Sequence, residues 1–135
     1  MVIRIANLDK CIKKFGDISG IDLMPEITEA TIKVQRMAKD LAPVGTPEST
    51  GIPGYVGGTL MRSIHRKMYP KYQSGIVYTT LEYASYVEFG TVNKDGSVRM
   101  YGQPYMIPAL DKNRAGINVS MKDYIRKQLK EKTHG

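Results

Sequence analysis

The acidic residue with the most suggestive neighbours in this sequence is Glu88. It lies among three aromatic rings, those of Tyr83, Tyr86 and Phe89, in the run Tyr-Ala-Ser-Tyr-Val-Glu-Phe-Gly-Thr. A carboxylate in such surroundings can act on a substrate or fix the backbone around it, and burying it in ionised form is costly unless it is hydrogen-bonded or paired. We favour the second role and expect Glu88 at the flank of a short helix, close to a backbone amide or a basic residue.

A catalytic alternative for the same carboxylate is a magnesium-dependent nuclease. Glu82, Glu88 and Asp95, with Lys94, would have to converge around the metal, because carboxylates hold magnesium next to phosphate groups. Asp95 precedes Gly96 in an apparent turn, whereas a metal site needs acids on rigid elements. The nuclease therefore remains the weaker reading.

Other reactive side chains are few. Ser63 and His65 can share a strand face, but a serine nucleophile also needs a base within hydrogen-bonding distance and a third group that orients the base. Cys11 is the one cysteine, so no internal disulfide forms, and it fits a small buried thiol. His65 and His134 are the only histidines, which leaves no credible zinc or haem set. We expect no enzyme activity, no metal, no cofactor and no small-molecule substrate.

Length and composition indicate one globular domain over residues 1–135. The chain is 41% hydrophobic and 24% charged, and its length allows a core that needs no metal or disulfide. No apolar run reaches the roughly 20 residues of a membrane span, and the first residues do not read as a signal peptide, so we expect a cytoplasmic protein without membrane contact. The net charge is +7, and residues 41–135 hold thirteen Lys and Arg against seven acids. A nucleic-acid-binding module is therefore an alternative function.

Hydrophobic periodicity and punctuation predict an α+β fold. Apolar residues at three- and four-residue steps predict an amphipathic helix from Asp22 or Met24 to Leu41, with Pro25 in its first turn and Pro43 beyond its end. We expect this helix to pack against a small antiparallel sheet of about three to four strands. The other predicted elements are a strand at 2–5, a short helix capped by Asn7, a helical turn that becomes a strand at 59–69, a strand at 76–80 in a hairpin with it, two helical turns at 83–91, an edge strand at 103–110 and a helix from Val119 to Lys132.

Two loops are predicted to be flexible, at 45–57 and 92–102. The first is rich in proline and glycine but lacks the Lys-Ser/Thr of a phosphate loop, so a partner-binding connection is the better interpretation. The second contains the Asp95-Gly96 turn. Between them, Gly90 is expected to end the short helix in a left-handed conformation, just before Thr91.

Four segments in this order resemble a known family. They are Leu-Ala-Pro-Val at 41–44, Gly-Thr-Leu-Met-Arg-Ser-Ile at 58–64, Glu-Tyr-Ala-Ser-Tyr-Val-Glu-Phe-Gly-Thr at 82–91 and Gln-Pro-Tyr-Met-Ile-Pro-Ala-Leu at 103–110. The sequence looks like the tail-completion or head-tail joining proteins of long-tailed bacteriophages, also described as minor tail components, over roughly residues 20–130. Its departure is the extra segment Gly-Thr-Pro-Glu-Ser-Thr-Gly-Ile-Pro-Gly-Tyr-Val-Gly after Val44, where the family passes almost directly to a Thr-Gly-x-Leu turn.

The resemblance implies a structural role in the neck or tail of a virion. The subunit would form a ring with six-fold symmetry between the portal-side connector and the tail tube, with nonspecific DNA contact through its basic surface as a further expectation. A ring subunit needs two unlike faces that meet head to tail, and aromatic residues are favoured at such surfaces. The residues expected at an interface or in positioning roles come from the two most specific runs: Tyr83, Tyr86, Glu88, Phe89, Gly90, Thr91, Pro104, Tyr105 and Pro108.

Overall fold

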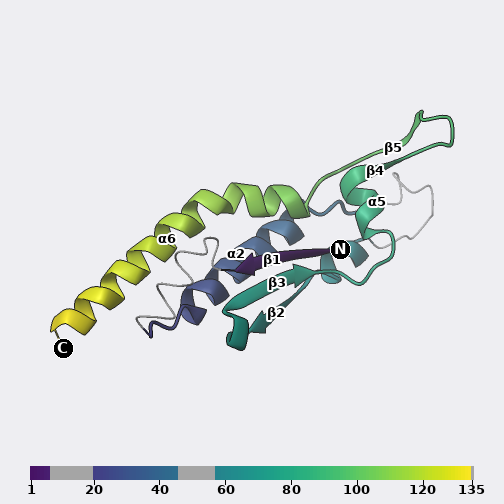
Figure 1. Cartoon of the computed structure of the whole chain (residues 1–135). Helices are drawn as coiled ribbons and strands as arrows, with labels where there is room; N and C mark the ends of the chain where they lie inside the picture. Colours follow the sequence, from purple (N-terminus) through teal and green to yellow (C-terminus); the bar gives the residue numbers. More distant parts are fainter. Residues whose placement is uncertain (7–19, 46–56, 135) are drawn as a thin grey trace.

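The computed structural model describes residues 1–6, 20–45 and 57–134 of the chain and has the predicted α+β architecture (Figure 1). A three-stranded antiparallel sheet is covered by helix α2, and the long helix α6 packs mainly along α2 and also touches the sheet at β1. The elements in chain order are β1 (Val2–Ala6), α2 (Met24–Leu41), α4 (Thr59–Arg62), β2 (His65–Tyr69), the 3₁₀ turn η1 (Pro70–Tyr72), β3 (Ser74–Tyr78), α5 (Ala84–Phe89), β4 (Gly90–Val92), β5 (Val98–Tyr101) and α6 (Met106–His134).

The sheet has the strand order β1-β3-β2, with both pairs antiparallel. Strands β2 and β3 form the predicted hairpin, and Val77 of β3 lies between Ile3 and Arg66 on its two neighbours. Arg66 donates to the side-chain oxygen of Gln35 on α2 at 2.6 Å, so this face of the sheet is the one that α2 covers. The opening strand, the hairpin and the helical turn before β2 are confirmed.

Helix α2 supplies the centre of the core, as its sequence pattern predicts. Ile27, Ala30, Val34 and Ala38 are buried, and they recur at the three- and four-residue steps that place them on one face. Pro25 lies in the first turn, where its missing N–H has no intrahelical partner to lose. Burial of the larger side chains among them, Ile27 and Val34, contributes about 1.5–3 kcal/mol each to folding.

The C-terminal helix is longer than predicted, and the edge strand expected at 103–110 is wrong. Helix α6 begins at Met106, well before the predicted start at Val119. Pro108 lies in its first turn, and the first four amides of a helix need no intrahelical acceptor, so this proline is compatible with a helix start. Met106, Ala109 and Ile117 enter the main core, while Met121 and Ile125 form a second cluster with the start of α2.

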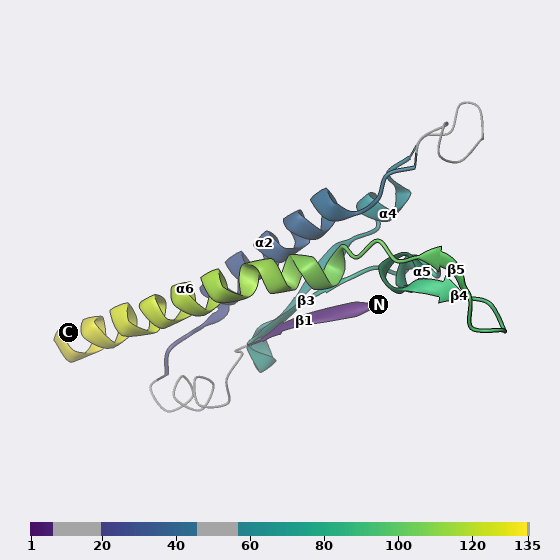
Figure 2. The same ribbon diagram turned by 90° about the horizontal axis from the view of Figure 1, so that it is seen from above.

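The segment 92–102, expected as a loop, is part of a hairpin. Strand β4 pairs antiparallel with β5, and the predicted turn at Asp95-Gly96 joins them. We call residues 90–102 the arm. Figures 1 and 2 both show α5 and the arm at the end of the molecule opposite the C-terminal end of α6. The predicted short helix capped by Asn7, the environment of Cys11 and most of the 45–57 loop lie outside the described residues.

Candidate functional site

Glu88 is buried between two helices and holds the start of α6. Its side chain is on α5 and only 1% exposed. Its Oε2 accepts hydrogen bonds from the backbone N–H groups of Tyr105 at 2.7 Å and Met106 at 2.9 Å, and Oε1 accepts one from Ile107 at 2.9 Å. The expected backbone amide partner is therefore present three times over. A negative charge at this position also interacts favourably with the positive end of the helix dipole.

The sequence just before α6 explains why a residue on another helix caps its N-terminal amides. Helix N-termini leave four amides without intrahelical acceptors, and Ser, Thr, Asp or Asn just before the helix usually satisfies one of them. Here the preceding residues are Gln103, Pro104 and Tyr105, none of which is such a cap. Glu88 thus replaces a local cap and ties α5 to α6.

Tyr105 makes a second connection between the same two helices. Its ring is fully buried, and its hydroxyl donates to the backbone carbonyl of Ala84 at 3.2 Å. Burial raises the pKa of Tyr105 to about 12, and the nearby negative charge of Glu88 acts in the same direction. The phenol is therefore neutral at physiological pH and acts as a hydrogen-bond donor.

The residues considered for catalysis are not gathered into a site. Glu82, Glu88 and Asp95 form no cluster, and the described part of the chain has no group of three or more His, Cys, Asp or Glu residues that could hold a metal ion. Both oxygens of Glu88 already accept backbone N–H groups. This geometry gives no support to the magnesium nuclease.

Ser63 and His65 also have separate surroundings. The Ser63 hydroxyl lies 2.6 Å from the carbonyl oxygen of Leu60 and shares a 2.7 Å hydrogen bond with Thr79. The His65 ring packs against Tyr78, with 5.8 Å between ring centroids. Their contacts are those of residues that join α4, β2 and β3, not those of a nucleophile and its base.

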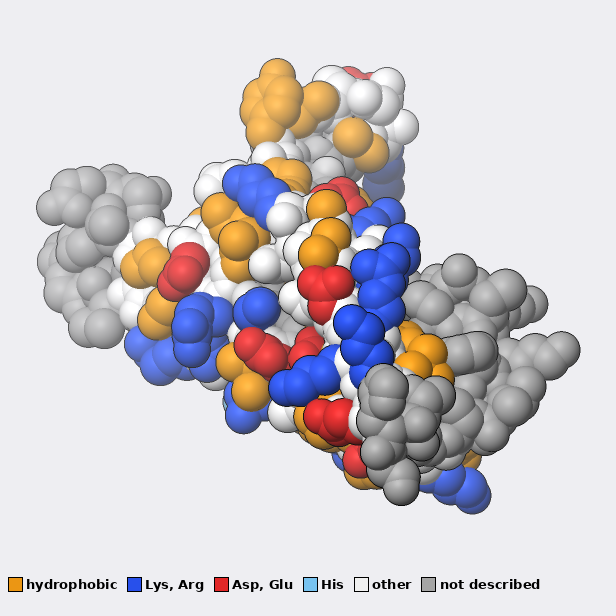
Figure 3. All heavy atoms as spheres, turned by 90° about the vertical axis from the view of Figure 1, so that its left-hand side faces the viewer, with side chains coloured by type: hydrophobic (Ala, Val, Ile, Leu, Met, Phe, Trp, Pro, Cys, Tyr) orange, Lys and Arg blue, Asp and Glu red, His pale blue; other side chains and the backbone are white. Residues whose placement is uncertain are grey.

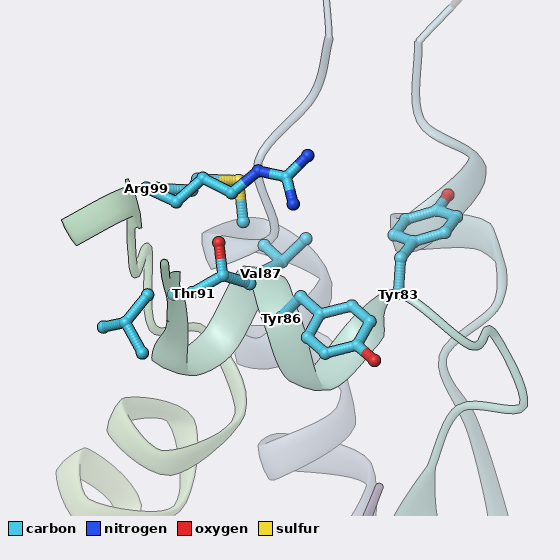
Figure 4. Close-up of a pocket in the computed structure, with 8 residues that line it drawn as sticks. Tyr83, Tyr86, Val87, Thr91 and Arg99 are labelled. Atoms are coloured by element: carbon cyan, nitrogen blue, oxygen red, sulfur yellow. The ribbon is translucent and has the colours of Figure 1, made fainter. Parts of the chain in front are cut away.

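A groove of about 950 Å³ opens between α5 and the arm (Figure 4). Its lining is mostly apolar and aromatic, with the hydroxyl of Thr91 and the charge of Arg99 as further groups, and consists of Tyr83, Tyr86, Val87, Gly90, Thr91, Val92, Arg99 and Met100. Figure 4 shows the Arg99 side chain extending from the arm toward the side on which Tyr83 lies. We call this feature the α5–arm groove.

Large hydrophobic side chains are exposed around the α5–arm groove. Tyr101 is 80% exposed, Val92 66% and Phe89 65%, and Tyr86, Val98 and Met100 are also exposed. Figure 3 shows hydrophobic side chains gathered at the upper end of the molecule, which carries the arm in Figure 1. Contiguous apolar surface of this kind marks sites that bind proteins, membranes or ligands.

Close backbone packing at its base fixes how the arm leaves α5. Gly90 has a φ of 78° and a ψ of −177°, so φ is positive as predicted, but the predicted left-handed helical conformation is wrong. The backbone is extended at this positive φ, a combination that is essentially restricted to glycine. A Cβ at this position would collide with the backbone of Met100 and of Gly102 on the returning strand. The arm thus begins at a point where two chain segments touch without intervening side chains.

The tip of the arm is ordered by its own hydrogen bonds. Asp95 accepts from the Ser97 backbone N–H at 2.9 Å and from the Ser97 hydroxyl at 2.6 Å, and these two bonds lower the pKa of the Asp95 carboxyl. Asn93 donates its backbone N–H to the Ser97 carbonyl at 2.8 Å and its side-chain amide to the Ser97 hydroxyl at 3.0 Å. Asp95 therefore presents a negative charge at the exposed end of the arm.

The predicted residues separate into a surface group and a buried group. Tyr83, Tyr86, Gly90 and Thr91 line the groove, and Phe89 is exposed on α5 outside the groove lining. Glu88 and Tyr105 are buried where α5 meets α6. Pro104 is exposed just before α6 and Pro108 is half-buried in its first turn, so both prolines shape the entry into the helix.

Sequence reasoning missed most of the arm residues. Val92, Arg99, Met100 and Tyr101 carry much of the exposed surface or the groove lining, but none was among the predicted residues. The available signal was the Asp95-Gly96 turn, because an Asp-Gly pair flanked by β-prone residues such as Val98 and Tyr101 is typical of a hairpin.

Comparisons of the chain with models of protein families, with curated proteins and with solved structures find no match. None of the helices in the described ranges combines the length and apolar character that crossing a membrane requires.

Proposed function

We propose that this chain is a structural assembly protein of a bacteriophage or prophage, a ring subunit that joins or completes the tail at the head-tail connector. The observation that carries the proposal is the arm, which exposes hydrophobic side chains at one end of the molecule. In this role the protein resides in the neck or tail of the particle, and in the host cytoplasm before assembly. It works by binding other proteins and uses no cofactor.

The link between the two most specific runs of the sequence supports this role. The run at 82–91 supplies α5 and Glu88, and the run at 103–110 supplies the backbone N–H groups that donate hydrogen bonds to Glu88. The arm begins at the end of the first run, and the rest of it, residues 92–102, is the chain between the two runs. Residues that resemble a tail-completion protein therefore serve to hold one exposed hairpin in a fixed position on the core.

Particles made without the protein test the proposal directly. We expect electron microscopy to show filled heads and finished tails that fail to join, and we expect the unaltered gene supplied in trans to restore joined particles. Normal infectious particles in the absence of the protein would contradict the proposal. The partners to examine are the portal-side connector and the tail-tube protein.

The exposed face of α6 favours a second candidate, nonspecific binding to nucleic acid. Lys112, Lys122, Arg126 and Lys127 are exposed on this helix, and Asp123 lies 3.8 Å from Arg126 as a partial counter-charge. Because phosphate neutralisation releases counterions, affinity for duplex DNA should fall steeply between roughly 50 and 200 mM salt. Binding of DNA that does not change with salt, or no binding, removes this candidate.

A further inference from the structure

The two faces of the arm differ in what they offer to a partner. Thr91 and Met100 are opposite each other in the β4–β5 ladder and both line the α5–arm groove. Side chains alternate along a strand, so Tyr101, next to Met100, points to the other face. We call that other face the back of the arm. One short hairpin thus carries an apolar groove wall on one side and an exposed tyrosine on the other.

An irregularity in the ladder brings a charge into the groove. The register shifts between Thr91 and Val92, because Thr91 pairs with Met100 while Val92 pairs with Val98. Arg99 is left without a direct partner across the ladder and lines the groove together with Met100. Bulges of this kind re-aim side chains and are common next to functional sites.

The arm also carries the opposite charge. Arg99 is the only charged residue in the groove lining, and Asp95 is the only acid in residues 90–102. Asp95 is exposed at the tip, where Ser97 donates two hydrogen bonds to it. Lys94 is exposed next to Asp95, so the polar tip is neutral as a whole, and the complementary charges are those of Asp95 at the tip of one molecule and Arg99 in the groove of another.

The arm lacks the cover that a hairpin of this size needs. In the described part of the chain β4 and β5 form a two-stranded sheet, and every residue of β5 is exposed. A two-stranded hairpin is marginally stable in water unless another surface packs on it. Its unpaired edges and exposed rings can gain that cover from a protein partner.

We infer that the partner is a second copy of this chain, whose arm lies with its back and its Asp95 tip in the α5–arm groove next to Arg99. The contact is head to tail, because it joins two unlike faces of the arm, and head-to-tail contacts close into rings when the rotation between copies permits. The inference rests on the proposed function and assigns the surface through which its ring subunits meet.

Self-association of the purified chain gives the first test. Light scattering over a concentration series should show oligomers of the wild-type protein, and Tyr101→Ser should weaken association by about tenfold or more, because exposed aromatic anchors dominate such interfaces. Tyr72→Ser is the matched control, since Tyr72 is 60% exposed but lies on η1, away from the arm. A wild-type chain that stays monomeric up to about 1 mM overturns the inference.

A charge exchange then tests which residues meet. Asp95→Arg leaves the groove intact and Arg99→Asp leaves the tip intact, so each variant alone should associate weakly. When the two are mixed, the arginine at position 95 of one copy faces the aspartate at position 99 of the other, and association between differently labelled copies should recover. Equal association in the mixture and in the separate variants means that the two residues do not meet between copies, which also overturns the inference.

Assembly assays separate this inference from the proposed function. If Tyr101→Ser and Arg99→Asp block the joining of heads to tails but leave self-association unchanged, the arm binds a connector or tail protein instead of a second copy. That result overturns the contact described here and leaves the assembly role in place. If particles lacking the protein are normal while the charge exchange succeeds, the self-contact holds and the assembly role does not.

Discussion

Glu88 is a helix cap delivered from another helix, and this accounts for its burial. Replacing it with glutamine keeps the size but leaves one of the three amides facing an NH₂ group instead of an oxygen. We expect Glu88→Gln to lower the free energy of unfolding by about 1–3 kcal/mol, the range for losing charged hydrogen bonds to buried amides. Urea denaturation followed by circular dichroism measures the change.

The neighbouring acid provides the control for this prediction. Glu82 is exposed just before α5, so Glu82→Gln should change stability by less than about 0.5 kcal/mol. If Glu88→Gln were as stable as Glu82→Gln, the three hydrogen bonds would not hold α6 in solution. If the Glu88→Gln protein cut DNA less well than a wild type that cuts it, while remaining folded, the nuclease would return as the better explanation.

Tyr105 gives the fold a predictable response to alkaline pH. Its pKa is about 12 in the folded protein, against about 10 for a tyrosine in an unfolded chain. Below pH 10 the Tyr105 hydroxyl keeps its proton in both the folded and the unfolded protein, and the contribution of Tyr105 to the free energy of unfolding is fully present. As the pH rises toward 12 the unfolded state releases its proton first, so unfolding becomes easier by roughly 2 kcal/mol.

The Tyr105→Phe variant isolates this effect. Other tyrosines and the lysines titrate in both proteins, so their contributions cancel in the difference between wild type and variant. We expect wild type to be the more stable below pH 10 by about 1 kcal/mol, through the bond to Ala84, and the difference to shrink or reverse as the pH rises to about 11.5. Parallel stability curves over that range would show that the phenol is not held neutral by burial.

At the scale of elements, two glycines should respond in opposite directions to alanine. Gly90 has a positive φ and backbone neighbours that a Cβ would meet, so Gly90→Ala should cost about 1–3 kcal/mol and loosen the arm from α5. Gly116 is exposed in the middle of α6 with open space around it. Gly116→Ala should therefore stabilise the protein by about 0.5–1 kcal/mol. Thermal unfolding of the two variants checks both signs, and equal shifts would contradict this account of the arm's base.

The elements that the sequence predicts correctly are those whose cause is local. The spacing of Ile27, Val34 and Ala38 is enough to define α2, and a short turn between β-prone segments is enough to define the β2–β3 hairpin. The start of α6 is not predicted correctly, because Pro104 and Pro108 are typical of a segment that is not helical. They are compatible with a helix only when the helix begins between them. Its cap is Glu88, which is 17 residues away from Tyr105 in the chain.

For the candidate site too, the sequence predicts the features with a local cause and not those that depend on how distant segments pack. The aromatic run at 83–91 identifies α5, and the cost of burying an unpaired carboxylate predicts a backbone amide or a basic residue beside Glu88. The structure decides between the two in favour of backbone amides. The α5–arm groove does not follow from sequence alone. It depends on how far β5 folds back, and the register shift that places Arg99 in the groove leaves no mark in the residue order.

At the scale of the whole molecule, the layout separates folding from docking. The core lies between the sheet, α2 and α6, whereas the arm projects from one end and contributes few side chains to that core. Substitutions of exposed arm residues should therefore affect assembly with little effect on stability. The two properties can be measured independently, which makes mixtures of wild-type and altered copies informative.

Mixed assembly gives the last prediction. A Tyr101→Ser copy keeps its groove, so it can accept a neighbour's arm but cannot dock well into the next copy. In the proposed ring it would enter a growing arc and prevent closure. With equal amounts of the two proteins, only about 2% of six-membered rings would contain wild-type copies alone if subunits mix at random. Joining of heads to tails in a reconstitution should then fall far below half. If joining of heads to tails fell only to the level given by the wild-type protein alone at half the concentration, the copies would act singly. The arm would then not link one subunit to the next.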